Sequence, residues 1–279
     1  MSSADPPSLA RRPGQTVRTR VSQHEVAGER VREDRLATEE PLEIRMAGPG
    51  APAQRVWVTM RTPGHDFELA AGFALNESLV SPGDITRVAY CTDADLDRVQ
   101  EFNVVTITVA GAVPIVTRHP ALSTGSSACG VCGKDSIASV LDVRAADPWT
   151  GPIPSPAVVR GLPGALSEHQ PVFKRTGGVH AAALADADGR LLVVREDVGR
   201  HNAVDKVIGA RVLAGQSRSV ACLVVSGRAG FELVQKAVTS GIGSLVSVGA
   251  PTSLSVQLAQ ESGMALFGFS GSSRCVQYA

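Results

Sequence analysis

The sequence predicts an α/β protein with a strand-rich first part and a second part in which strands alternate with helices. In the first part, short apolar or alternating runs are bounded by Gly, Pro and Asp, which is typical of β-strands. In the second part, apolar runs of strand length alternate with segments of helical periodicity. This alternation favours a mostly parallel sheet that is covered by helices on its faces.

The first part is predicted to hold three strands and a helix that packs on them. From His65 to Leu79 the apolar side chains fall largely on one helical face, and Pro63-Gly64 forms a turn just before them. A second, short helix is a candidate for residues 135–143. The three strands are predicted at residues 41–46, 55–60 and 102–109.

The composition divides the chain into three segments. Residues 1–20 are rich in Ser, Pro and Arg and are predicted to be a mobile tail. Residues 21–150 form the strand-rich part, and residues 151–279 form the α/β part. The boundary is placed near residue 150 because four prolines cluster there, which indicates a connection between structural units. They are Pro148, Pro152, Pro154 and Pro156.

The second part begins with a hairpin and continues with alternating elements. The polar turn Asp186-Ala187-Asp188-Gly189 is predicted to join strands at residues 179–185 and 191–194. The elements that follow are a helix at 202–213, a strand at 220–225, a helix at 231–239, a strand at 245–248, a helix at 253–261 and a strand at 265–269.

This topology predicts a ligand site, because ligands of open α/β sheets bind outside the carboxyl ends of the strands. Three of the loops at this edge lead into helix N-termini, whose free N–H groups and positive dipole end suit phosphate. We therefore expect a phosphate-bearing ligand. The converging loops are Arg195 to His201, Ser226 to Gly230, Gly249 to Thr252 and the segment after Phe269.

The first of these loops, residues 195–202, is dense in charge for a segment between a strand and a helix. One interpretation is structural: Asn202 caps the next helix with support from Asp205, and the other charged side chains form solvated ion pairs. This interpretation assigns the loop no ligand.

The alternative interpretation is a binding site. Arg200 and His201 would donate to a phosphate or a purine edge, while Glu196 or Asp197 would accept from a ribose hydroxyl or guanine N–H groups. Arg228 would supply a further guanidinium. The chain contains no Walker motif, so a hydrolytic nucleotide site is not predicted.

The cysteine loop Cys129-Gly130-Val131-Cys132-Gly133 is the sharpest chemical feature. Its glycines leave the backbone open, and Lys134 places a cation nearby, conditions that lower a thiol pKa. Three interpretations are open from the residues: reactive thiolates, half of a zinc site that His119, His180 or a remote cysteine would complete, and a thioredoxin-like redox pair.

The cysteine count and the charge balance limit location and partners. Five cysteines without an export signal do not suggest a disulfide framework, so we expect a cytoplasmic protein. Lys and Arg together number 27, as do Asp and Glu, so no global field attracts nucleic acid or an anionic membrane. The apolar runs are far shorter than the roughly 20 residues that cross a bilayer, so no membrane span is expected.

Several blocks of the sequence, in order from about residue 55 to the end, resemble the signature blocks of the FdhD family. The resemblance is specific because it includes the cysteine loop and the charged loop together. The blocks are Arg61 to Gly64, Ser127 to Lys134, Thr176 to Ala182, Arg195 to Lys206, and Val225 to Ala229 with Leu233 to Ala237.

The resemblance implies a formate dehydrogenase accessory protein. Such a protein takes sulfur from a cysteine desulfurase as a persulfide and passes it to bis-molybdopterin guanine dinucleotide. By this resemblance Cys129 holds the persulfide and Cys132 is its partner. The resemblance also implies cytidine deaminase-like α/β/α layers in the larger part, a homodimer, and no metal ligands of the chain's own.

The resemblance also implies where the client cofactor binds, and the phosphate argument adds cations from the neighbouring loops. An alternative is a non-catalytic chaperone that only shields the cofactor. A zinc-dependent deaminase would need His-x-Glu and Pro-Cys-x-x-Cys motifs, and the sequence has neither. The expected cofactor-binding residues are Phe269, Ser270, Gly271, Ser272, Ser273 and Arg274, with Arg200, His201 and Arg228.

Overall fold

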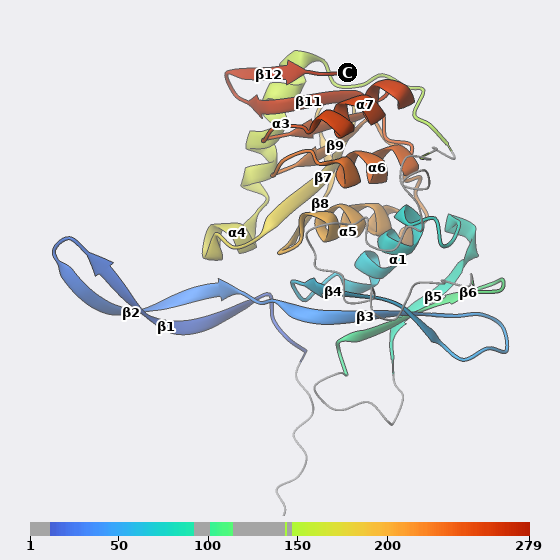
Figure 1. Ribbon diagram of the computed structural model, residues 1–279, viewed down its shortest axis with the longest axis horizontal. Coiled ribbons are helices and arrows are strands. Elements are labelled where there is room, and N and C mark those ends of the chain that lie inside the picture. The colour runs from blue at the N-terminus through green and yellow to red at the C-terminus, as the bar shows by residue number, and fades with distance from the viewer. Residues whose placement is uncertain (1–11, 92–100, 114–142, 144–146) are drawn as a thin grey trace, which may run out of the picture.

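The computed structural model describes residues 12–91, 101–113, 143 and 147–279. Cys129 and Cys132 lie outside the described residues, as does all of the predicted helix at 135–143 except Val143. The described chain forms a two-stranded ribbon, a four-stranded sheet and a six-stranded sheet; in Figure 1 the six-stranded sheet lies above the four-stranded one, and the ribbon projects to the left. The α/β prediction is confirmed.

The four-stranded sheet and one helix make up the first unit. Strand β3 alternates between buried and half-buried positions, and Leu42, Ile44 and Met46 are fully buried beneath helix α1. The strand order is β4-β3-β6-β5, with β3 and β6 parallel and the other neighbours antiparallel. The elements are β3 (Glu40–Ala47), β4 (Gln54–Arg61), α1 (Asp66–Asn76), β5 (Ile85–Tyr90) and β6 (Val104–Val109).

The six-stranded sheet of the second unit is mixed, so the prediction of a mostly parallel sheet was wrong in part. Strand β7 lies between β8 and β9 and runs antiparallel to both, because α5 carries the chain from β8 across β7 to β9. Strands β8 to β11 still share one direction, so their carboxyl ends meet at one edge as predicted. The order is β12-β11-β10-β9-β7-β8. The strands are β7 (His180–Ala185), β8 (Leu191–Asp197), β9 (Cys222–Val225), β10 (Ser244–Ser247), β11 (Ala265–Gly271) and β12 (Arg274–Gln277).

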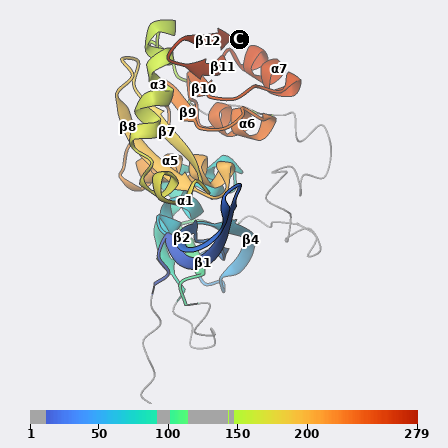
Figure 2. The same ribbon diagram turned by 90° about the vertical axis from the view of Figure 1, so that its left-hand side faces the viewer.

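Helices cover both faces of this sheet, as Figure 2 shows in a view along the sheet. Helices α5, α6 and α7 bury one face, and α3 buries the other through Val159, Leu162 and Leu166. No helix in the described ranges is long and apolar enough to span a bilayer. The helices are α3 (Pro156–Glu168), α4 (Pro171–Thr176), α5 (Arg200–Leu213), α6 (Phe231–Thr239) and α7 (Ser253–Ser262).

Helices α3 and α4 were not predicted, because their prolines suggested a connection. Pro156 and Pro171 occupy the first helical positions, where a missing N–H group and a fixed φ are tolerated. The chain also joins the second unit before the predicted boundary at residue 150. Val143 packs against that core, and the Trp149 N–H group donates to the Gly241 carbonyl.

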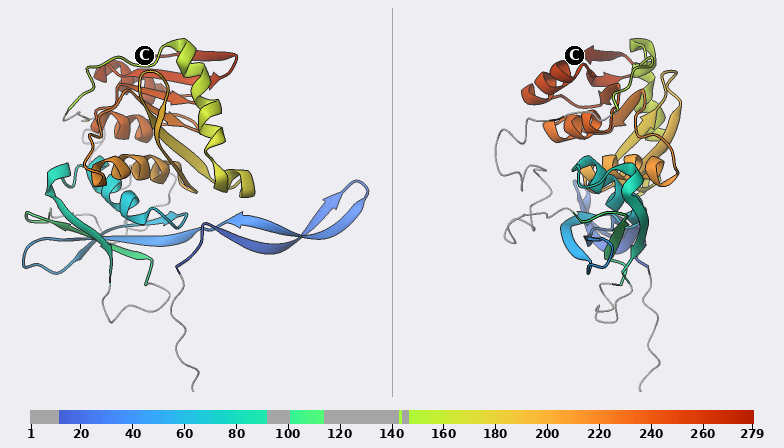
Figure 3. Two further views of the ribbon diagram at one scale, coloured as in Figure 1. Left: turned by 180° about the vertical axis from the view of Figure 1, so that it is seen from behind. Right: turned by 90° about the vertical axis from the view of Figure 1, so that its right-hand side faces the viewer.

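The ribbon consists of β1 (Thr16–Glu25) and β2 (Gly28–Ala37), and it begins inside the segment predicted to be a tail. Figures 1 and 3 show it projecting away from both sheets. Its charged side chains weaken the apolar alternation that identifies a strand. Some of these side chains pair with an opposite charge on the other strand, as Arg18 on β1 does with Glu33 on β2 at 3.2 Å.

The two units meet where α1 crosses α5 at two glycines. A Cβ atom on Gly72 would lie 1.8 Å from the Asp205 carbonyl oxygen, and one on Gly209 would lie 1.9 Å from the Glu68 carbonyl oxygen. These distances are shorter than any van der Waals contact. The helix backbones therefore touch, and only glycine fits at either position.

Replacing Gly72 with Ala is expected to lower the free energy of unfolding by about 3 kcal/mol or more, which is the upper end of the usual cost of overpacking. The cost is high because the new Cβ meets the backbone of Asp205, which cannot move aside as a side chain can. Urea denaturation would measure the change. The matched control is Gly161→Ala in α3, where nothing lies within 4 Å of the new Cβ. The control should be neutral or slightly stabilising. Equal denaturation midpoints for the two variants would contradict the backbone contact.

Candidate functional site

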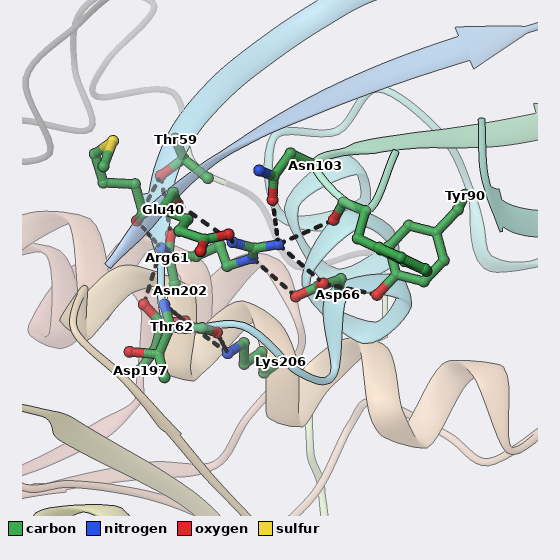
Figure 4. Close-up of polar contacts among 12 residues, drawn as sticks. Glu40, Thr59, Arg61, Thr62, Asp66, Tyr90, Asn103, Asp197, Asn202 and Lys206 are labelled. Carbon is green, nitrogen blue, oxygen red and sulfur yellow. Dashed lines mark hydrogen bonds and ion pairs between the residues drawn. The ribbon is translucent and has the colours of Figure 1, made fainter. Parts of the chain in front are cut away.

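The charged loop after β8 is a buried junction between the two units (Figure 4). The fully buried carboxylate of Asp197 accepts from the backbone N–H groups of Thr62 (3.2 Å) and Gly199 (2.8 Å) and from Asn202 Nδ2 (3.1 Å). It also pairs with Lys206 Nζ at 2.6 Å, and that ammonium is fully buried too. The loop is therefore fixed to the end of β4 and to α5.

The neighbouring carboxylate of Glu196 has a different partner, the N-terminus of α4. It accepts from the N–H groups of Val172 (2.9 Å) and Phe173 (2.7 Å). Neither carboxylate of the loop is thus free for a ribose or a guanine, as the binding interpretation proposed. The structural interpretation was also wrong in its geometry, because Gly199 is the N-cap of α5 and Asn202 donates to the β4 backbone.

A second buried ion pair stabilises the first unit behind this junction. Arg61 is fully buried and pairs side-on with Asp66, with N–O distances of 3.1 and 3.2 Å. The Tyr90 hydroxyl donates to Asp66 at 2.8 Å, and burial followed by the Asp66 charge raises the pKa of Tyr90 to about 12. The first signature block is therefore structural (Figure 4).

A pocket of about 740 Å³ lies at the carboxyl edge of the six-stranded sheet. Its floor comes from the strand ends: Val198 after β8, Ser226 after β9, Val248 after β10, and Ser270 and Gly271 at the end of β11. The segments after β8 and β9 and the segment after Phe269 therefore converge on a cavity, as predicted, whereas the predicted loop from Gly249 to Thr252 does not line it. The wall is formed by α3, α4 and the turn before β7, and includes Leu166, Gln170, Phe173, Gly177, Gly178 and His180.

Three buried polar atoms at this edge of the sheet, of which only that of Ser270 belongs to the pocket lining, have no hydrogen-bond partner among the described residues. They are Arg200 Nε, His201 Nε2 and Ser270 Oγ. Burial, followed by the charges of Arg200 and His201, lowers the pKa of His180, which lines the pocket. Buried polar groups in proteins are normally satisfied. These atoms are suited to donate to an anionic ligand.

His201 also faces Glu232 on α6. Its Nε2 lies 3.9 Å from a Glu232 oxygen, which is too far for a hydrogen bond, yet the imidazole is the main cause that lowers the pKa of that carboxyl. The carboxylate balances part of the positive charge that Arg200 and His201 bring to this edge.

The predicted cofactor segment, residues 269–274, covers the last residues of β11, the turn and the first residue of β12, and it is divided between the pocket and its surroundings. Ser270 and Gly271 line the pocket, whereas Ser272 and Ser273 form an exposed turn. Phe269 has a φ of 47°, a left-handed conformation that is strained for a bulky residue and is typical of functional sites. The Arg274 guanidinium lies 5.5 Å from the centre of its ring.

Arg228 is exposed on the loop after β9 and does not line the pocket. Cys222 is fully buried in β9, and burial raises the pKa of its thiol to about 12, so it is unreactive. The described ranges contain no group of three His, Cys, Asp or Glu side chains that could hold a metal ion.

Sequence reasoning missed part of the pocket. His180 was weighed only as a zinc ligand, although it lies in the signature block from Thr176 to Ala182, which contains two glycines. Helix α4 was not predicted, so the part of the pocket wall that it forms was missed as well. The signal that could have found that wall is Pro171 at the first helical position, followed by a Gly177 with a φ of 64° at the helix end.

The chain is similar to proteins of known family over nearly its whole length. The model of the FdhD/NarQ family matches residues 37–279 of the chain. A sulfur carrier protein FdhD from Nocardia farcinica is 47% identical over 257 residues, covering 91% of this chain and 89% of that protein. One from Mycolicibacterium paratuberculosis is 47% identical over 267 residues, covering 91% and 93%. The crystal structure of a formate dehydrogenase accessory protein from Desulfotalea psychrophila matches 95% of this chain and 96% of that one at 23% identity, with a TM-score of 0.72, which shows a common fold.

Replacing Lys206 with Met should lower the free energy of unfolding by about 3 to 5 kcal/mol, because Asp197 would be left buried without a counter-charge. Chemical denaturation measures this. The exposed Lys174→Met variant on α4 serves as control and should change stability by no more than about 0.5 kcal/mol. A Lys206→Met protein as stable as the control would show that the pair does not hold the junction.

Proposed function

The chain belongs to the FdhD/NarQ family, and from this membership we propose that it is a sulfur carrier that serves formate dehydrogenase. Cys129 accepts sulfur from a cysteine desulfurase, Cys132 shares or relays it, and the acceptor is bis-molybdopterin guanine dinucleotide. The observation that carries the proposal is a pocket at the strand ends, lined by the unpartnered Ser270 hydroxyl, in a chain that also contains the Cys-Gly-Val-Cys-Gly motif.

The loading step is a thiol exchange that balances without an added oxidant. The Cys129 thiolate attacks the terminal sulfur of the desulfurase persulfide, and a sulfur–sulfur bond forms on Cys129. The donor's sulfur–sulfur bond breaks, and its cysteine leaves as a thiolate. A neighbouring cation and glycines on both sides favour an accessible thiolate at this position.

The pocket residues fit the nucleotide end of the cofactor. The volume of the pocket lies within the range of about 300 to 1,000 Å³ that is usual for small-molecule sites. Arg200 Nε, His201 Nε2 and Ser270 Oγ would donate to phosphate or guanine oxygens, and Phe269 and Arg274 would flank the ligand. When bound, the cofactor supplies the metal centre that accepts sulfur.

The proposal extends to architecture and assembly. The sheet with α3 on one face and α5 to α7 on the other is compatible with the cytidine deaminase-like layering that the family resemblance implies. A cytoplasmic location and a homodimer belong to the same proposal.

Replacing Cys129 with Ala should abolish formate dehydrogenase activity in cells that depend on this protein. On the purified wild-type protein, incubation with a cysteine desulfurase and cysteine should add the mass of one sulfur atom, labile to cyanide, to Cys129. Cys275→Ala is the control, because that thiol lies half-buried on β12 outside the pocket lining. Full activity of Cys129→Ala would favour a chaperone that only shields the cofactor.

Replacing Arg200 with Gln should weaken binding of guanosine diphosphate by about tenfold or more, since a charge-assisted hydrogen bond contributes about 1.5 to 3 kcal/mol. Titration calorimetry measures the affinity. Arg87→Gln, an exposed change on β5, should leave it unchanged. Equal affinities for Arg200→Gln and wild type would place the nucleotide elsewhere.

A further inference from the structure

The pocket at the carboxyl edge of the six-stranded sheet has no charged side chain among the described residues that line it. Its lining is apolar or glycine apart from five polar residues, namely Ser167, Gln170, His180, Ser226 and Ser270. Burial, followed by the charges of Arg200 and His201, lowers the pKa of His180, so its imidazole is neutral at pH 7. The lining therefore offers a phosphate group no counter-charge.

The N-terminus of α4, which borders the pocket, does not offer an anion site either. The Glu196 carboxylate already accepts from the backbone N–H groups of Val172 and Phe173, at 2.9 and 2.7 Å. These are the groups that the start of a helix presents to an anion. Because the carboxylate also offsets the positive end of the helix dipole, a second anion would be repelled there.

The positively charged groups of this edge lie outside the pocket lining. Arg200 and His201 begin α5, which covers the face of the sheet opposite to α3 (Figure 2). Helix α3 lines the pocket, whereas neither Arg200 nor His201 does. A ligand with charged and uncharged parts would therefore place its phosphates beside α5 and its uncharged part in the pocket.

Gln170 is a buried polar side chain of the pocket wall without a partner. It is the N-cap residue of α4 and is only 6% exposed, yet its side chain makes no capping hydrogen bond. Its amide has no other hydrogen bond to the part of the chain that the structure describes. An amide has two donor hydrogens and an acceptor oxygen, and leaving them buried and unpaired is costly. A ligand in the pocket would satisfy them.

Ser270 supplies a second uncharged group. It is 4% exposed, it lines the same pocket at the end of β11, and its hydroxyl has no partner among the described residues. With Gln170 and the neutral His180 it forms a set of groups that each donate and accept. Leu166 and Phe173 add apolar surface for the face of a ring. A few uncharged polar groups on an apolar wall suit a planar heterocycle.

This chemistry fits a 2-amino-4-oxopyrimidine edge, in which a carbonyl oxygen, a ring N–H group and an amino group stand in a row. A side-chain amide binds such an edge twice, because its NH₂ group donates to the carbonyl and its oxygen accepts from the ring N–H group. Guanine and pterin both carry this edge, and the client cofactor of the proposed function contains both rings. The edge that they share defines the class of ligand.

We propose that the pocket binds this uncharged edge of guanine or pterin, with Gln170 as the residue that recognises it, while the phosphates of the same molecule stay outside beside Arg200 and His201. The inference rests on the proposed function for the identity of the ligand. It adds the part of the ligand that enters the pocket and a specificity residue on α4, outside the predicted cofactor segment at residues 269–274.

Titration calorimetry on the full-length protein tests this division with three probes. Guanosine and neopterin carry the edge without phosphate, and inorganic pyrophosphate carries the charge without the edge. The wild-type protein should bind guanosine, neopterin or both, and pyrophosphate should not displace them. Binding of guanosine alone assigns the pocket to the guanine end of the cofactor, and binding of neopterin alone assigns it to the pterin end.

Gln170→Leu should weaken binding of the uncharged probes by about tenfold or more, because their hydrogen bonds to the amide are lost. It should leave pyrophosphate binding unchanged, and Arg200→Gln should have the reverse effect. Gln216→Leu, an exposed change just beyond the C-terminus of α5, is the matched control and should alter neither. Urea denaturation of each variant confirms that it is folded, and Gln170→Met repeats the test with an unbranched side chain.

Three results would overturn the inference: a wild-type protein that binds neither uncharged probe, displacement of these probes by pyrophosphate, or a folded Gln170→Leu protein with wild-type affinity for them. Persulfide uptake on Cys129, measured on the same samples, separates this inference from the sulfur carrier. Normal uptake together with any of these results leaves the carrier standing. Absence of uptake in a wild-type protein that binds guanosine removes the carrier and leaves the pocket assignment.

Discussion

The buried pair of Asp197 and Lys206 is the interaction on which the rest of the site depends. Two charges in a fully buried position are tolerated only when both are paired and hydrogen-bonded, because removing them from water costs several kcal/mol each. Here the carboxylate has four donors, and the ammonium also donates to the carbonyls of Thr62 and Glu196. The pair therefore holds the end of β4, the end of β8 and the start of α5 in one geometry.

This arrangement explains why the Arg200 Nε–H group at this edge of the sheet has no acceptor within the described part of the chain. The carboxylates nearest to Arg200 in the sequence are Glu196 and Asp197, and both are occupied by α4 and by the junction. Arg200 Nε therefore remains without an acceptor. The close crossing of α1 on α5 at Gly72 holds the helix that carries Arg200 and His201. The donors are thus fixed in place before any ligand binds, which lowers the entropic cost of binding.

The alternating elements of the second part were predictable because buried strands and amphipathic helices differ in period. The predicted helix at 231–239 has the bounds that the structure gives α6. The role of the charged loop was not predictable, since the residue types of Asp197 and Lys206 are the same in a solvated ion pair and in a buried one. The ribbon of β1 and β2 was missed for a related reason: its strands are rich in Arg and Glu, so pairing rather than apolar alternation defines them. The convergence of strand ends on a pocket could be predicted from the topology, whereas the part of the pocket wall that α4 forms became visible only in the structure.

Helix α4 connects the ribbon formed by β1 and β2 to the proposed binding site. Its N-terminus is held by Glu196, and its C-terminal turn leads to Gly177 and Gly178, which line the pocket. The base of the ribbon packs against the same turn through Ala37, the last residue of β2. A helix of six residues has little stability of its own and takes its position from what surrounds it. Because the ribbon and the pocket both contact this short helix and the turn that follows it, the position of β2 and the position of the pocket wall are set together.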